Sequence, residues 1–206
     1  MTDVEKYYQS FMRDIAALQE SSGDEGSATP QVFTQIAVDM LADAGETENV
    51  VVAYDEKNLG KVGQHKINAY AISENYETVD LFISVFYQTA TTIQNFVKSD
   101  IDRATTQITN FFRKAIDTDY VEKIEESSEI FDFADTLANY QEIKENLVRV
   151  NAFILTNGEY RGDFPPSDPI GGYNVFYRVI DINYLYKISE QSRVPIEIDF
   201  NDFDGE

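Results

Sequence analysis

The stretch from Lys66 to Gln88, KINAYAISENYETVDLFISVFYQ, most constrains the fold, because two apolar runs flank a short polar segment. This pattern is typical of a β-hairpin, and residues 74–77 tolerate a turn. We therefore expect antiparallel strands over residues 66–73 and 78–87. Side chains alternate between the two faces of a strand, so the second strand has an apolar face and a mixed face. These faces comprise Val79, Leu81, Ile83 and Val85, and Asp80, Phe82, Ser84 and Phe86, respectively.

Two helices and a strand are predicted before this hairpin. Apolar residues recur at helical spacing over residues 3–20, and the segment 21–30, SSGDEGSATP, breaks that pattern. Thr29 and Pro30 form a suitable start for a second helix, which Gly45 ends. The run NVVVAYD, residues 49–55, then predicts a short buried strand.

After the hairpin, helical spacing predicts one continuous helix over residues 91–115. We expect it to pack across the sheet through Ile93, Phe96, Ile101, Ile108 and Phe112. Shorter helices are expected around residues 119–125 and 129–143. The run NLVRVNAFILTNG is apolar on both faces of a strand, which suits the middle of a covered sheet.

The last third of the chain alternates loop, strand and helix. Residues 157–173, NGEYRGDFPPSDPIGGY, contain three prolines and four glycines, so we expect a surface loop without regular structure. NVFYRVID follows as a strand, and Asp181 can cap the helix INYLYKISEQS. The run VPIEIDF closes the chain as a last strand.

This order of elements predicts an α/β fold, with α+β as the alternative, in which helices flank a mixed central sheet. The core order, a helix, three strands, a long helix and a strand, is followed by a strand-helix-strand extension. We expect residues 31–206 to form one domain, preceded by an amphipathic helix at 1–20 and a linker at 21–30.

Composition excludes several classes of function. The chain of 206 residues is 43% hydrophobic, enough for a sizeable core. It contains no cysteine, which excludes disulfides, thiolate metal sites and cysteine nucleophiles. The formal charge of −21 repels phosphate backbones, so we do not expect this chain alone to bind nucleic acid. Without a membrane span or signal peptide in the sequence, we expect a soluble cytoplasmic protein.

Carboxylates near the second helix and the hairpin are the candidate metal ligands. Phosphodiester hydrolysis needs a divalent cation held by carboxylates, and usually a lysine near the attacking water. The candidates are Asp39, Asp43, Glu46 and Asp80. The alternative is structural: Asp39 and Asp43 have the spacing of a solvated helix face, and Asp80 marks the turn. The acidic segments 117–147 and 197–206 are likewise interpreted as solvated surface, with a site for a cation or a basic partner as the alternative.

The other motifs in the sequence do not indicate a catalytic or cofactor site. Asp55 and Lys57 match the acid-x-lysine spacing of a nuclease, but they precede the hairpin, so we assign them no catalytic role. His65 is the only histidine and is interpreted as a hydrogen-bonded loop residue. The tail DFNDFDGE ends too early for a calcium loop, and no glycine pattern for phosphate binding is present. No cofactor site is predicted.

The core order is also that of the PD-(D/E)XK nuclease superfamily. More specifically, the hairpin, RVNAFILTNGEY, YRVIDINYLYKISE and PIEIDF resemble the N-terminal region of the abortive infection phage resistance (AIPR) family. The resemblance covers roughly residues 30–200. It implies a role in bacterial phage defence, and a chain that is the N-terminal piece of a longer protein.

The resemblance also implies where a catalytic hairpin would hold its residues. The aspartate, glutamine and lysine of nuclease-like relatives fall on Asn68, Ile83 and Val85. We therefore expect a catalytically degenerate domain that binds a protein partner or the remainder of a longer chain. One alternative is an active Mg²⁺- or Mn²⁺-dependent nuclease that uses the four carboxylates above. Another is an unrelated protein-interaction module that uses the aromatic-rich loop 158–173.

Overall fold

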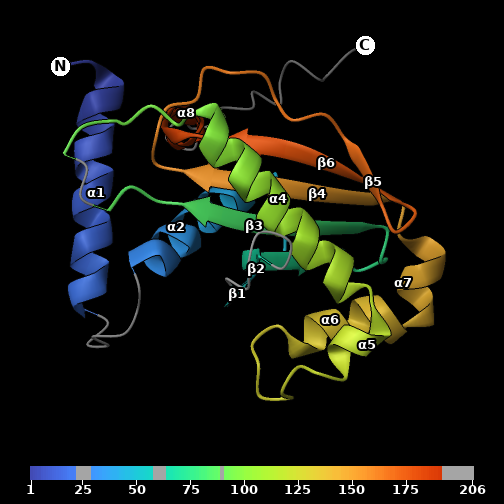
Figure 1. The fold of residues 1–206 in the computed structure, drawn as a ribbon. Helices are drawn as coiled ribbons and strands as arrows, with labels where there is room; N and C mark the ends of the chain where they lie inside the picture. Colours follow the sequence, from blue (N-terminus) through green and yellow to red (C-terminus); the bar gives the residue numbers. More distant parts are fainter. Residues whose placement is uncertain (22–28, 58–63, 89–90, 192–206) are drawn as a thin grey trace, which may run out of the picture.

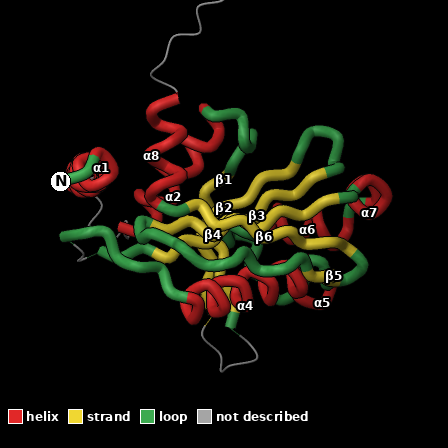
Figure 2. Tube along the Cα trace, turned by 90° about the horizontal axis from the view of Figure 1, so that it is seen from above, coloured by secondary structure: helices red, strands yellow, loops and turns green. Residues whose placement is uncertain are grey.

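A mixed β-sheet with helices on both faces forms the centre of the computed structural model, which describes residues 1–21, 29–57, 64–88 and 91–191 (Figures 1 and 2). The six strands are β1 (Val51–Lys57), β2 (His65–Ile72), β3 (Thr78–Val85), β4 (Arg149–Thr156), β5 (Asp168–Ile170) and β6 (Tyr173–Ile180). This arrangement confirms the predicted α/β class.

Among the described residues the strand order is β1-β2-β3-β4-β6-β5, so β1 and β5 are the edge strands of this part of the sheet. Neighbours are antiparallel from β1 to β3, parallel from β3 through β4 to β6, and antiparallel again at β5. The parallel pairs place β4 in the middle of the sheet, as its two apolar faces predicted.

The predicted hairpin is confirmed. Ala71 pairs with Asp80 and Ile72 with Val79, and the amide of Ser73 donates to the carbonyl of Thr78 at 3.0 Å to close the turn. The second strand ends at Val85, two residues before the predicted end.

One face of the sheet is covered by α4 (Lys98–Ala115), α5 (Thr118–Val121), α6 (Phe131–Asn139) and α7 (Gln141–Asn146). The apolar face of β3 packs here. Leu81 and Ile83 are fully buried against α4 residues such as Ile108 and Phe112. Burying a side chain of this size contributes about 1.5–3 kcal/mol.

The opposite face is covered by α1 (Asp3–Ser21), α2 (Thr29–Asp43) and α8 (Ile182–Gln191). Phe82 and Phe153 stack at the centre of this layer with ring centroids 4.8 Å apart. The amide of Tyr184 donates to Asp181 Oδ1 at 2.9 Å, which confirms the predicted helix cap. None of the helices within the described ranges has the length and apolar character needed to span a membrane.

The prediction of one helix over 91–115 was wrong at its start, because α4 begins at Lys98. Asn95 forms a parallel bridge with Glu159, and the amide of Phe96 donates to the carbonyl of Glu159 at 2.7 Å. Ile93 consequently packs on the α1, α2 and α8 side of the sheet. β-branched residues are frequent in this segment and favour extended backbone, so a non-local strand contact outweighs the helical spacing.

Two further expectations needed correction. The predicted helix at 129–143 is two helices, because Tyr140 between them is extended. The loop 157–173 contains β5, which pairs with β6 through a turn at Gly171 and Gly172, both at positive φ. Two such residues suit a tight hairpin turn. The predicted last strand VPIEIDF and most of the linker 21–30 lie outside the described residues.

Candidate functional site

The positions implied for a catalytic hairpin are occupied by packing residues. Ile83 is fully buried in the core under α4, and Val85 packs against the same core. Asn68 is also fully buried, and its Oδ1 accepts a 2.8 Å hydrogen bond from the amide of Ser84. The side chain of Asn68 therefore binds the β3 backbone, and this face of β3 presents no polar group to a metal or a water.

Asp80 points to the other face of β3 and is 8% exposed. Its Oδ2 accepts from Thr47 Oγ1 at 2.8 Å, and its Oδ1 accepts from Asn151 Nδ2 at 2.7 Å. Arg149 Nε in turn donates to Asn151 Oδ1 at 2.7 Å. Burial raises the pKa of the Asp80 carboxyl, and the two hydrogen bonds oppose that rise. Asp80 is thus a buried carboxylate held by neutral donors.

Glu46 lies beside the same open pocket of about 470 Å³, which Thr47, Asp80 and Asn151 also line. Its Oε1 accepts from the Tyr184 hydroxyl at 2.6 Å, and its Oε2 pairs with Arg178 Nη1 at 2.8 Å. These two hydrogen bonds lower the pKa of Glu46. The carboxylate is therefore engaged by an ion pair from β6 and a hydroxyl from α8.

The other two candidate carboxylates do not join this pocket. Asp39 and Asp43 are exposed on α2, and Asp39 accepts a 2.8 Å hydrogen bond from Gln35 one turn earlier. The structure therefore brings Asp80 and Glu46 together and leaves Asp39 and Asp43 on a helix surface. Among the described residues, no three acidic or histidine side chains are grouped so that they could hold a metal ion.

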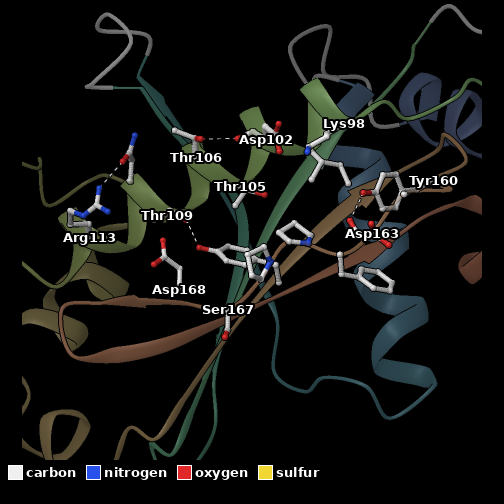
Figure 3. Close-up of a pocket in the computed structure, with 17 residues that line it drawn as sticks. Lys98, Asp102, Thr105, Thr106, Thr109, Arg113, Tyr160, Asp163, Ser167 and Asp168 are labelled. Carbon is white, nitrogen blue, oxygen red and sulfur yellow. Dashed lines mark hydrogen bonds between the residues drawn. The ribbon is translucent and has the colours of Figure 1, made fainter.

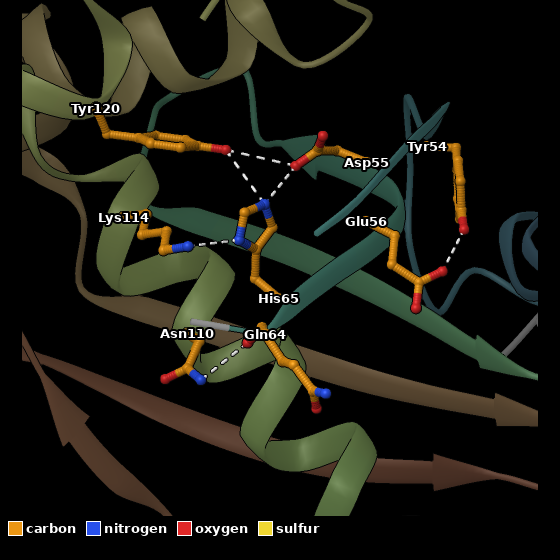
Figure 4. A network of polar contacts seen from close by, with 8 residues as sticks. All are labelled: Tyr54, Asp55, Glu56, Gln64, His65, Asn110, Lys114 and Tyr120. Atoms are coloured by element: carbon orange, nitrogen blue, oxygen red, sulfur yellow. Dashed lines mark hydrogen bonds and ion pairs between the residues drawn. The ribbon is translucent and has the colours of Figure 1, made fainter. Parts of the chain in front are cut away.

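A second polar cluster, the His65 network, joins β1, β2, α4 and α5 (Figure 4). His65 is fully buried, and its Nε2 lies 2.6 Å from Asp55 Oδ2. Its Nδ1 lies 2.7 Å from Lys114 Nζ. The Tyr120 hydroxyl lies 3.4 Å from both His65 Nε2 and Asp55 Oδ2. Both ring nitrogens of the histidine are thus engaged by charged side chains.

The partners of His65 fix its resting tautomer. An ammonium group can only donate, so Lys114 Nζ donates to Nδ1, and Nε2 carries the ring proton that is donated to Asp55. Burial raises the pKa of Asp55, but its contact with His65 and the charge of Lys57 outweigh burial and lower it. The pKa of Asp55 is therefore held below its ordinary value, and its carboxylate accepts from Nε2–H of the ring.

The sequence predicts His65 as a loop residue and assigns no role to Asp55 and Lys57. The structure places His65 at the start of β2, opposite Lys57 in the β1–β2 register, with Asp55 two positions earlier on β1. Antiparallel pairing of two strands joined by a short connection was the signal that could have predicted the contact between Asp55 and His65, because it places residues 55–57 beside residues 65–67. Nothing local indicated that Lys114 and Tyr120 would complete the cluster.

An open groove of about 980 Å³ lies between α4 and the segment 160–168 (Figure 3). Threonines 105, 106 and 109 line its α4 side, where the Thr109 and Tyr177 hydroxyls are 2.6 Å apart. Phe164, 64% exposed, and two prolines line the other side. The charged residues of the groove are Lys98, Asp102, Arg113, Asp163 and Asp168.

Comparison with known proteins identifies the family. The family model described as the abortive infection phage resistance protein N-terminal domain matches residues 33–187. Searches of curated proteins and of solved structures found no match. Because the matched segment spans most of the 206 residues, the chain belongs to the abortive infection phage resistance family and carries its N-terminal domain.

Proposed function

We propose that this domain serves phage defence as a catalytically degenerate, nuclease-like module that binds a protein partner or the remainder of a longer chain. The observation that supports this proposal is that apolar packing residues stand at the hairpin positions where the resemblance would place catalytic side chains. Ile83 is fully buried at the position of the glutamine, and Val85 packs beside it at the position of the lysine. A metal-dependent site needs oxygen ligands and a positioned water, and neither residue can supply them.

The test is a cleavage assay with plasmid, single-stranded DNA and RNA in Mg²⁺ and in Mn²⁺. The parent is compared with a variant carrying Asp39→Asn, Asp43→Asn, Glu46→Gln and Asp80→Asn, which keeps side-chain volume and removes four charges. We expect no cleavage by either protein and no heat of metal binding in calorimetry. Cleavage by the parent that the variant lacks would instead establish the active nuclease.

The groove between α4 and the segment 160–168 is the surface on which we expect the partner to bind. It runs beside α4 from Lys98 to Arg113, and fifteen residue steps at about 1.5 Å each make it about 22 Å long. An extended segment of about six or seven residues spans that length. Exposed Phe164 offers an aromatic contact at its rim.

The charges that line the groove and the net charge of the chain indicate which kind of partner can bind. Three aspartates line the groove against one lysine and one arginine, and the whole chain carries −21. A field of this sign attracts cationic partners and repels anionic ones. The partner of this proposal is therefore an extended, positively charged polypeptide segment, not nucleic acid.

A further inference from the structure

The His65 network places a lysine in a setting that favours chemistry at its amine. Lys114 Nζ lies 2.7 Å from His65 Nδ1, and the opposite ring nitrogen lies 2.6 Å from the Asp55 carboxylate. Lys114 belongs to the last turn of α4 and is partly exposed, whereas His65 is fully buried. A carboxylate on one imidazole nitrogen stabilises the imidazolium that forms when the other nitrogen takes a proton.

One proton can therefore move within this cluster. In the hydrogen-bonded arrangement, the Lys114 ammonium donates to His65 Nδ1. Transfer of a proton from Nζ to Nδ1 leaves a neutral amine beside an imidazolium, which the negative charge of Asp55 stabilises. Such a neutral amine is the nucleophilic form of lysine.

The groups that face Lys114 favour the same transfer. Lys57 from β1 and Lys114 from α4 both lie over the ring of Tyr120 from α5, at 5.8 and 5.9 Å from its centroid. Burial and the nearby charge of Lys57 lower the pKa of Lys114, and Asp55 partly opposes them. A second cation near an amine is a known way to activate it.

We propose that Lys114 is a nucleophilic lysine that activated acyl donors such as acyl phosphates acylate, with His65 as its base and Asp55 as a positioning residue. The site does not depend on whether the domain is a nuclease. None of its residues is one of the hairpin positions Asn68, Ile83 and Val85 or one of the four candidate carboxylates of the metal site.

The reaction with acetyl phosphate balances without a further reactant. The lone pair of Nζ forms a bond to the carbonyl carbon, and the bond from that carbon to the phosphate oxygen breaks. Phosphate leaves with the electron pair. Of the two protons that the ammonium loses, the first passes to His65 Nδ1 and then to solvent, and the second goes to the departing phosphate. The product is an uncharged amide at residue 114.

The decisive measurement is the rate of acetylation of each lysine. The protein is incubated with acetyl phosphate from pH 6.5 to 9.5, and each site is quantified by peptide mass spectrometry. Lys144, an exposed lysine in the last turn of α7, is the internal reference. We expect Lys114 to react several-fold faster than Lys144 at pH 7, because burial and the nearby charge of Lys57 lower the pKa of its amine. Equal rates and overlapping pH profiles for the two lysines would overturn the proposal.

Two variants separate activation from structure. His65→Gln keeps a donor and an acceptor on a side chain of similar size but cannot take the proton. We expect it to bring acetylation of residue 114 down to the rate of Lys144, with Lys144 unchanged and circular dichroism like that of the parent. Asp55→Asn removes the charge that stabilises the imidazolium, and the same charge raises the pKa of Lys114. We expect slower acetylation of Lys114 in this variant because the imidazolium loses its counter-charge, and an unchanged or faster rate would contradict the role of Asp55. Full-rate acetylation of Lys114 in a folded His65→Gln protein would contradict the role of the base. If a variant does not fold, the pH profile of the parent alone decides.

Discussion

Asp80 on β3 and Asn151 on the parallel strand β4 are register partners, and Asn151 Nδ2 donates a 2.7 Å hydrogen bond to Asp80 Oδ1. The contact satisfies one oxygen of a carboxylate that is 8% exposed. Neither partner of that carboxylate carries a charge, because the second donor is the Thr47 hydroxyl. Ionised Asp80 therefore bears a desolvation cost that an ion pair would offset.

This relationship predicts a pH-dependent effect of Asp80→Asn. The pKa of Asp80 is raised in the folded protein above its ordinary value of 3.8, so the folded state binds more protons than the unfolded state just above that pH. The contribution of Asp80 to the free energy of unfolding consequently falls as pH rises from 3.8 through the folded-state pKa. We expect Asp80→Asn to gain stability relative to the parent as pH rises above 3.8, and to keep that gain at neutral pH.

Urea unfolding of both proteins at several pH values measures this difference. Asp39→Asn, at an exposed residue of α2, is the control for the general relief of negative charge. A difference between Asp80→Asn and the parent that does not change with pH would show that the titration of Asp80 is not coupled to folding.

Ile83→Gln should be strongly destabilising. Ile83 is fully buried between the sheet and α4, so the substitution loses apolar burial and leaves an amide without a water contact. We expect a loss of at least about 3 kcal/mol in the free energy of unfolding. Val85→Gln, at a partly exposed position of the same face, should cost less than about 1.5 kcal/mol. Urea unfolding measures both variants. Equal losses in the free energy of unfolding would argue against the interpretation that this face of β3 serves packing.

The groove predicts a charge-dependent interaction. We expect a fluorescent eight-residue peptide rich in lysine and arginine to bind the parent, and Asp102→Asn with Asp163→Asn and Asp168→Asn to weaken binding about tenfold. Fluorescence anisotropy at two salt concentrations measures this, because screening reduces such attraction.

The matched control for the groove removes three charges elsewhere, through Asp39→Asn, Asp43→Asn and Glu145→Gln, all at exposed positions. This variant should bind like the parent. Equal loss in both triple variants would attribute binding to the net charge of the chain and not to the groove.

Gly158→Ala tests the contact between the end of β4 and the segment before α4. A Cβ atom at residue 158 would lie 2.8 Å from the Tyr87 ring and 3.0 Å from the carbonyl oxygen of Gln94. Because the second contact is with backbone, we expect the segment to shift at a cost of about 1–3 kcal/mol. Thermal unfolding measures it, and an unchanged midpoint would mean that the segment moves aside freely.

Local patterns were sufficient to predict the hairpin, the central strand and the cap at Asp181, because each depends on alternation or capping within a few residues. The start of α4 could not be predicted in this way, since the bridge from Asn95 to Glu159 joins segments far apart in the chain. The His65 network could not be predicted from local patterns either. Asp55 and His65 are brought together by neighbouring strands, but Lys114 reaches them only because α4 packs across β2.

The two edge strands limit how this sheet can be extended by another chain. At one edge, the amide of Tyr54 on β1 donates to Glu129 Oε2 at 2.8 Å, so a side chain occupies a donor that an incoming strand would need. At the other edge, β5 is three residues long and has Pro169, which has no amide hydrogen, at its centre. Short strands, prolines and charged side chains at edges all oppose strand addition. Self-assembly through open strands, a route to aggregation of β-rich proteins, is therefore disfavoured at both edges of the sheet that the described residues form.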